Sequence, residues 1–123
     1  METKFEELLG KTLKSIKISD DKWSIVFETE TGEKYKMEGE SDCCNSVTVE
    51  DIAGNLDDLI GSPILQAEEA TSGENPEGVN PEYQDSFTWT FYKLATVKGY
   101  VTIRWYGESN GYYSESVNFE KYV

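Results

Sequence analysis

The chain has 123 residues with 24 acidic and 11 basic side chains, a formal net charge of −13, and 13% aromatic residues. This length and aromatic content suit a single domain over residues 1–123 with a real hydrophobic core. The charge argues against direct nucleic-acid binding, which needs a basic surface. The sequence contains no histidine, so the usual catalytic triads and most catalytic zinc sites are excluded. We therefore expect a non-enzymatic protein without a metal or cofactor. No apolar run approaches bilayer length, so we expect no membrane partner.

The first third of the chain predicts a short helix followed by a three-strand meander. The helix covers residues 5–9 and stops at Gly10, a residue suited to the left-handed conformation that often ends helices. Alternating apolar residues then predict strands at 12–19, 23–29 and 34–38. The side chains expected on the inward faces of the last two strands are Trp23, Ile25, Phe27, Tyr35 and Met37.

The middle of the chain predicts two short helical turns, a strand and a polar loop. Residues 49–54 and 55–61 are amphipathic, and Asn55 is a good N-cap for the second of these turns. Residues 64–70 predict a further strand. Residues 71–85, TSGENPEGVNPEYQD, have little apolar content and predict a mobile loop.

Both cysteines of the chain, Cys43 and Cys44, are adjacent and so offer no disulfide framework. We expect them to be buried or half-buried structural residues, because the neighbouring Glu40 and Asp42 oppose a reactive thiolate. This cysteine usage favours a reducing, cytosolic setting.

Residues 87–119 predict three consecutive antiparallel strands rich in Thr, Val, Ile and aromatic side chains. Two three-residue loops, at 97–99 and 109–111, each place glycine third, as a bulged hairpin loop requires. This register pairs Phe91 with Trp105, Tyr92 with Arg104, Trp105 with Glu115 and Arg104 with Ser116. It gathers on one core face Trp89, Phe91, Val101, Ile103, Trp105, Tyr113, Val117 and Phe119.

These elements together predict an α+β fold. Its sheet would be a single twisted antiparallel sheet made of two three-strand meanders, with the short helices packed at one side. The sequence leaves open whether the molecule associates into a homo-oligomer.

The opposite face of the three strands carries a candidate ligand site. Arg104 lies between Tyr92 and Tyr106 in the predicted register, where it can offer a donor fork and a stacking surface together. The candidate ligand-binding residues are Arg104, Tyr92, Tyr106, Thr90, Asn110, Tyr112, Ser114 and Ser116. The alternative is an ordinary solvated face, which antiparallel sheets commonly present.

Three stretches carry a resemblance to a known group of proteins. They are EELLGKTLKSI, DCCNSVTVEDIAGNLDDLIGSPILQAEE and TWTFYKLATVKGYVTIRWYGESNGYYSESV. Together they resemble a group of small phage and prophage proteins of uncharacterised function, over nearly the whole chain except residues 71–85. The resemblance implies a viral origin and action in the cytoplasm of a host bacterium. It carries over no catalytic residues.

Small non-enzymatic phage proteins often antagonise bacterial defence systems, and by this analogy we expect the same here. Two mechanisms stay open. In the first, the protein binds and sequesters a small nucleotide-like signal molecule, with Arg104 on a phosphate and the tyrosines stacking. In the second, its acidic surface mimics nucleic acid and inhibits a host defence nuclease or regulator. Acidic mimicry should weaken steeply as ionic strength rises, whereas a desolvated pocket should respond less.

Overall fold

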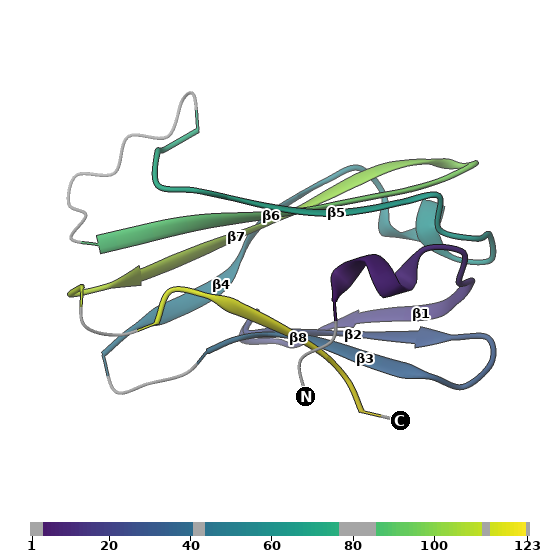
Figure 1. The fold of residues 1–123 in the computed structure, drawn as a ribbon, viewed down its shortest axis with the longest axis horizontal. Coiled ribbons are helices and arrows are strands. Elements are labelled where there is room, and N and C mark those ends of the chain that lie inside the picture. The colour runs from purple at the N-terminus through teal and green to yellow at the C-terminus, as the bar shows by residue number, and fades with distance from the viewer. Residues whose placement is uncertain (1–3, 41–43, 77–85, 112–113, 123) are drawn as a thin grey trace.

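The computed structural model describes residues 4–40, 44–76, 86–111 and 114–122. In these residues the chain forms two four-stranded antiparallel sheets, stacked as a sandwich (Figure 1). The predicted α+β fold is therefore wrong, and the fold is mostly β. Helical structure in the described part of the chain is confined to two short 3-10 segments, η1 (Phe5–Leu8) and η2 (Leu56–Leu59).

The first sheet contains the predicted meander plus one strand from the far end of the sequence. Strands β1 (Leu13–Ile18), β2 (Ser24–Thr29) and β3 (Lys34–Gly39) follow one another as expected, and β8 (Val117–Lys121) pairs with β3. The inward assignment is confirmed for four side chains that are fully buried: Ile25, Phe27, Tyr35 and Met37. Trp23 is only half-buried.

The second sheet has the order β4-β7-β6-β5, with β4 (Ser46–Ala53), β7 (Gly99–Ser109), β6 (Ser86–Thr96) and β5 (Gln66–Ser72). The amphipathic turn expected at 49–54 is instead largely the end of β4, because those residues pair with β7.

Between β4 and β5, the second expected turn exists as η2. Asn55 caps it, accepting a hydrogen bond from the Asp57 amide at 3.0 Å. The predicted loop begins later than expected, because Thr71 and Ser72 belong to β5, and residues 77–85 lie outside the described residues.

The second predicted meander is wrong at its second turn. The stretch after β7 does not fold back on β7. Its last part, β8, pairs with β3 in the other sheet and places Phe119 opposite Met37. The place beside β7 is taken by β4, with Val49 opposite Trp105. Burial of the Phe119 ring explains this choice, because it packs against the rings of Phe5, Phe27 and Tyr35 between the sheets.

The register of β6 also differs from the prediction by one residue. A two-residue turn sets Thr96 opposite Gly99, so that Thr90 faces Trp105 and Tyr92 faces Ile103. The turn is held by the Thr96 hydroxyl, which donates to the Asp58 carbonyl and accepts from the Lys98 amide at 3.1 Å. The faces assigned to β7 are confirmed, whereas those of β6 are inverted: Thr90 and Tyr92 point inward, and Trp89 and Phe91 point outward.

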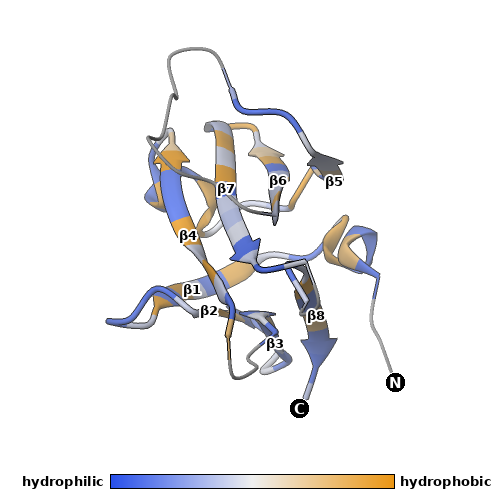
Figure 2. Cartoon of the chain, turned by 90° about the vertical axis from the view of Figure 1, so that its left-hand side faces the viewer, coloured by the Kyte–Doolittle hydropathy of each residue, from blue (hydrophilic) through white to orange (hydrophobic). Residues whose placement is uncertain are grey.

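The two sheets share one hydrophobic core. Phe5 of η1 joins them, because its ring lies 4.7 Å from the Tyr92 ring and 5.3 Å from the Phe119 ring. Figure 2 shows the two layers edge-on, with η1 at the side where β5 and β8 lie. We call this side, where η1 packs on the edge strand β5 and β8 is the edge of the other sheet, the open side; β1 and β4 are the edge strands of the opposite side.

Cys44 is exposed, contrary to the expectation of a buried or half-buried thiol. It lies in the connection between β3 and β4, two residues before Ser46, where β4 begins. Cys43 lies outside the described residues.

Candidate functional site

The eight residues expected to bind a ligand do not form one site. Thr90 and Tyr92 face the interior, whereas Arg104 and Tyr106 face outward from β7. Asn110 is exposed in the turn that follows β7. The remaining residues are Ser114 and Ser116, in the segment that crosses to β8, and Tyr112, which lies outside the described residues.

Arg104 is engaged by the protein's own carboxylates. Its Nε lies 2.5 Å from Glu50 Oε2, and its guanidinium reaches Asp51 at 4.0 Å. A bulge in β4 between Val49 and Asp51 brings both acidic residues to the same arginine. The hydrogen bond with Glu50 raises the pKa of Arg104 above its usual value and outweighs the opposing effect of burial. The Arg104 guanidinium, which was expected to bind a phosphate, therefore already pairs with Glu50 and Asp51.

The outward aromatic residues of β6 and β7 form a small cluster of their own. The Trp89 ring lies 4.6 Å from the Tyr106 ring and 5.1 Å from the Arg104 guanidinium carbon. Trp89 Nε1 donates to Asn75 Oδ1 at 3.1 Å, and the side chain is only 2% exposed. Tyr106 donates to Glu108 at 2.7 Å. Tyr92 lies in the core with no exposed surface, so it has no face free for stacking on a ligand.

A cleft of about 340 Å³ opens between the sheets at the open side of the sandwich. Its walls come from the inner faces of β5 and β6, the start of β8 and the end of β3. The residues that line it are Glu40, Glu69, Thr71, Thr88, Thr90, Ser116, Val117 and Asn118. None of these described lining residues is basic, so the cleft is poorly suited to a phosphate. Sequence reasoning named Thr90 and Ser116 as binding residues but did not place them between two sheets.

Glu115 crosses over the second sheet beside this cleft. It accepts hydrogen bonds from Thr88 at 2.8 Å and from Ser109 at 2.7 Å. Burial raises the pKa of Glu115, but the hydrogen bonds from Ser86, Ser109 and Thr88 outweigh that effect and hold the pKa below its usual value. The carboxylate thus anchors the crossing segment to β6 and β7.

A second hollow, of about 760 Å³, lies where β2 begins and β3 ends. It is lined by Asp21, Trp23, Glu38, Gly39, Glu40, Ser114 and Asn118. Asp21 accepts hydrogen bonds from the Ser19 hydroxyl at 2.6 Å and the Trp23 amide at 3.0 Å, and these lower its pKa. This hollow too has carboxylates and no basic side chain among its described lining residues.

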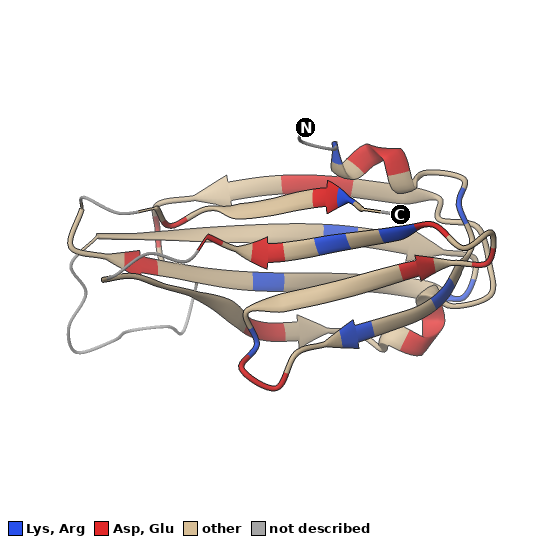
Figure 3. Cartoon of the chain, turned by 90° about the horizontal axis from the view of Figure 1, so that it is seen from below, with Lys and Arg blue, Asp and Glu red and all other residues tan. Residues whose placement is uncertain are grey.

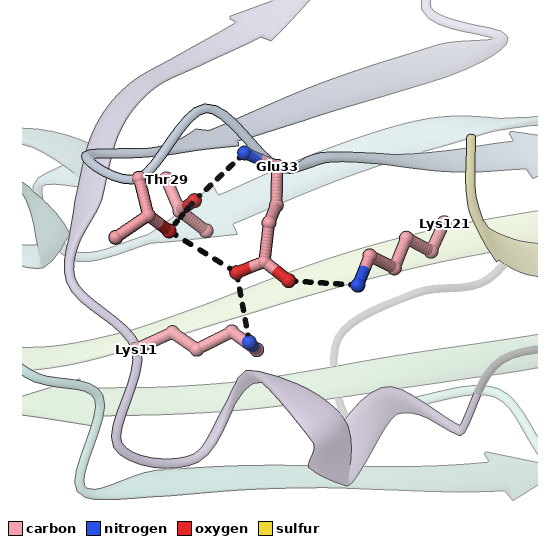
Figure 4. A network of polar contacts seen from close by, with 5 residues as sticks. Lys11, Thr29, Glu33 and Lys121 are labelled. Carbon is pink, nitrogen blue, oxygen red and sulfur yellow. Dashed lines mark hydrogen bonds and ion pairs between the residues drawn. The ribbon is translucent and has the colours of Figure 1, made fainter. Parts of the chain in front are cut away.

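A polar network around Glu33 ties the first sheet together (Figure 4). The Glu33 carboxylate forms ion pairs with Lys11 at 2.8 Å and with Lys121 at 2.7 Å. The hydrogen bond from Lys11, followed by that from Lys121, lowers the pKa of Glu33 to about 2. Its partners come from the start of the chain, the β2–β3 turn and β8, so the network is structural.

Four exposed carboxylates lie on η1 and the neighbouring edge strand β5, where the consecutive Glu68 and Glu69 point to opposite faces of the strand. We call them the acidic edge: Glu6, Glu7, Glu68 and Glu69. Figure 3 shows the acidic colour on η1 directly beside the middle of β5. None of the four forms an ion pair with a lysine or arginine in the described residues, although Glu7 lies near Tyr35 and Lys121 and contributes to the raised pKa of both.

No group of three or more metal-ligating side chains in the described residues could hold a metal ion. No helix there has the length and apolar character needed to span a membrane.

The fold and surface define a two-sheet β-sandwich with an acidic edge and a polar cleft between its layers. The chain belongs to the DUF7448 family, a domain of unknown function whose model matches residues 6–119. No curated protein and no solved structure matches the chain. The prediction that the chain belongs to a family of uncharacterised function is therefore confirmed.

Proposed function

We propose that the protein is a non-enzymatic binding protein whose acidic edge docks on a basic surface of a protein partner. The observation that supports this proposal is the acidic edge itself. Its four exposed carboxylates form no ion pair with the lysines or arginine of the described residues. Complementary charge steers association and selects partners more than it adds affinity. A chain with a net charge of −13 attracts basic surfaces that otherwise bind nucleic acid.

We further propose that this partner is a host defence nuclease or regulator, which the protein inhibits by imitating nucleic acid in the bacterial cytoplasm. The support is the resemblance to small phage and prophage proteins together with the acidic edge. The sequestration of a nucleotide-like signal has weaker support. Arg104 is already paired with Glu50 and Asp51, and Tyr92 lies in the core.

The experiment compares two triple variants of equal net charge in bacteria that carry a phage-restricting defence system. The first variant, Glu6→Gln/Glu7→Gln/Glu68→Gln, alters the acidic edge. The control, Asp20→Asn/Glu30→Gln/Asp57→Asn, removes three exposed carboxylates elsewhere. We expect phage to form plaques about tenfold or more efficiently on bacteria that carry the wild-type protein than on bacteria that carry the first variant. A loss of this size is expected when charge-assisted contacts are removed. The control should plate like the wild type.

Both variants should keep the wild-type thermal midpoint at about 0.15 M salt, because the replaced side chains are exposed and their repulsion is screened there. Equal loss of plating in the two triple variants would mean that only net charge matters and that no defined face docks. Full activity of the acidic-edge variant would place the interface elsewhere.

A further inference from the structure

The cleft between β5, β6 and β8 has polar walls at positions where a sandwich normally buries apolar side chains. Thr88 and Thr90 of β6 and Thr71 of β5 all face inward, and Thr71 lies directly opposite Thr90 in the sheet. Inward positions further along β6 and β7 carry apolar side chains, Tyr92, Leu94, Val101 and Ile103. On β6 the inward apolar residues thus end at Tyr92, and the side chains of Thr90 and Thr88 line the space beyond it, whereas Val47 and Trp105 continue the core on β4 and β7.

Thr90 gives this cleft a specific polar group. Its side chain is only 3% exposed and lines the cleft, yet its hydroxyl makes no hydrogen bond to any residue in the described ranges. The hydroxyl is not among the fully buried side-chain atoms that lack a partner, so its oxygen keeps some contact with the space of the cleft, where a valine of nearly the same shape would offer no hydrogen bond. Thr90 therefore presents a hydrogen-bonding group to whatever occupies the cleft.

The charge of the cleft selects the kind of partner. Glu40 and Glu69 lie at its border, and neither forms an ion pair with a described basic side chain. No lysine or arginine is among the described lining residues. Two carboxylates beside a group of hydroxyls and the Asn118 amide favour ammonium groups and disfavour phosphate or carboxylate groups.

We propose that this cleft binds a small organic cation, one that carries ammonium groups and can also hydrogen-bond to hydroxyls, such as a polyamine. Its volume of about 340 Å³ lies at the lower end of ligand sites, which suits a molecule of this size. Glu69 and Glu40 hold the ammonium groups, and Thr90 with Thr71 and Asn118 supplies the remaining hydrogen bonds. The site shares Glu69 with the acidic edge, but its ligand is a small molecule, whereas the docking interaction proposed above involves a macromolecule.

The experiment uses spermidine as the probe, at about 0.15 M salt so that diffuse charge attraction is screened. Binding is measured by calorimetry, and amide chemical shifts report its place. We expect shifts at Thr71, Thr88 and Thr90. Glucose, as a neutral molecule, and AMP, as an anion, should bind far more weakly than spermidine.

Matched variants locate the site on one face of β5. Glu68 and Glu69 are both exposed and consecutive, but only Glu69 lines the cleft. We expect Glu69→Gln to weaken spermidine binding about tenfold and Glu68→Gln to leave it nearly unchanged. Equal effects of the two changes would overturn the proposal, because they would indicate diffuse attraction to an acidic surface.

Thr90→Val separates a binding role from a structural one. We expect it to weaken spermidine binding by roughly three- to tenfold, the loss of one hydrogen bond, while the thermal midpoint stays the same or rises. Thr102→Val, on the outward face of β7, is the control and should leave binding unchanged. No shift at Thr71, Thr88 or Thr90 with spermidine would overturn the proposal and leave a water-filled cleft. The acidic-edge triple variant retains Glu69, so failure here and failure of the docking proposal are distinguishable.

Discussion

Arg104 is the only arginine of the sequence, and the fold uses it internally. It compensates two acidic residues brought together by the β4 bulge and covers part of the Trp89 ring. The residue that looked most like a ligand contact therefore joins β4, β6 and β7. Its neighbours could not be inferred from the sequence, because Glu50 and Asp51 reach it through a bulge between distant strands.

Replacing Arg104 with alanine should lower the free energy of unfolding by about 1 kcal/mol. A partly exposed ion pair contributes roughly 0.2–1 kcal/mol, and an exposed cation–π contact roughly 0.5–1 kcal/mol. Arg104→Lys should recover part of the loss, because it keeps the charge but not the planar fork. Urea denaturation of the three proteins measures this. An unchanged midpoint in Arg104→Ala would show that the contacts add nothing, and loss of the proposed anti-defence activity in a stable variant would restore a ligand role for this arginine.

Glu33 should give the protein a recognisable acid response. Its pKa falls from an ordinary value of 4.5 to about 2 in the folded state, so its pairing stabilises the fold above pH 4.5. This contribution is lost as the pH falls from 4.5 toward 2, because the carboxylate must take up a proton.

We expect Glu33→Gln to reduce stability at pH 7 and to flatten its decline between pH 4.5 and 2, as followed by thermal midpoints across that range. Asp21 and Glu115, whose pKa values are also lowered, keep part of the decline in the variant. A pH profile parallel to that of the wild type would show that the network around Glu33 does not persist in solution.

Among the elements, the meander β1–β2–β3 was predictable, because the large apolar side chains of β2 and β3 alternate; in β1, Leu13 breaks the phase where the structure has a bulge. The stretch that forms β6 has aromatic side chains in both phases, at Phe87, Trp89, Phe91 and Tyr92. Periodicity therefore could not choose its inward face. The choice depends on the contact of Thr96 with Asp58, which no local pattern reveals.

The predicted ligand site was wrong for the same reason as the predicted faces of β6. Thr90 and Tyr92 turned inward with the register, so they could not join Arg104 and Tyr106. The cleft was beyond sequence reasoning for a different reason. Its walls come from both sheets, and the prediction held only one sheet.

Gly107 in β7 is required by the segment that crosses above it. A Cβ there would lie 2.3 Å from the Glu115 carbonyl oxygen, a backbone atom that cannot swing aside. We expect Gly107→Ala to destabilise the protein by about 1–3 kcal/mol, the usual cost of overpacking. Gly73→Ala is the control, because nothing lies within 4 Å of its added Cβ. Equal thermal midpoints for the two variants would contradict the crossing described here.

At the scale of the whole molecule, the sandwich carries far more negative than positive charge. Several of its few basic groups are already paired with carboxylates, so the remaining acidic residues repel one another in the compact state. We expect the thermal midpoint to rise when the salt concentration increases from about 0.02 to about 0.15 M, because the Debye length falls to roughly 8 Å. A midpoint that falls with salt would show that ion pairs outweigh repulsion. The acidic-edge triple variant should show a smaller rise than the wild type.

The pairing of β8 with β3 has a consequence for how the chain reaches its native state. During synthesis the ribosome releases β1, β2 and β3 long before β8. Until β8 is made, the edge of β3 stays unpaired and the hydrophobic core beside it is incomplete. Pairings between distant parts of a chain form slowly, because loop-closure entropy is lost before contacts compensate for it. Refolding should therefore take roughly milliseconds to seconds, as in other sandwiches of this kind. During that interval the unpaired edge of β3 is the site at which nascent chains would aggregate or bind a chaperone.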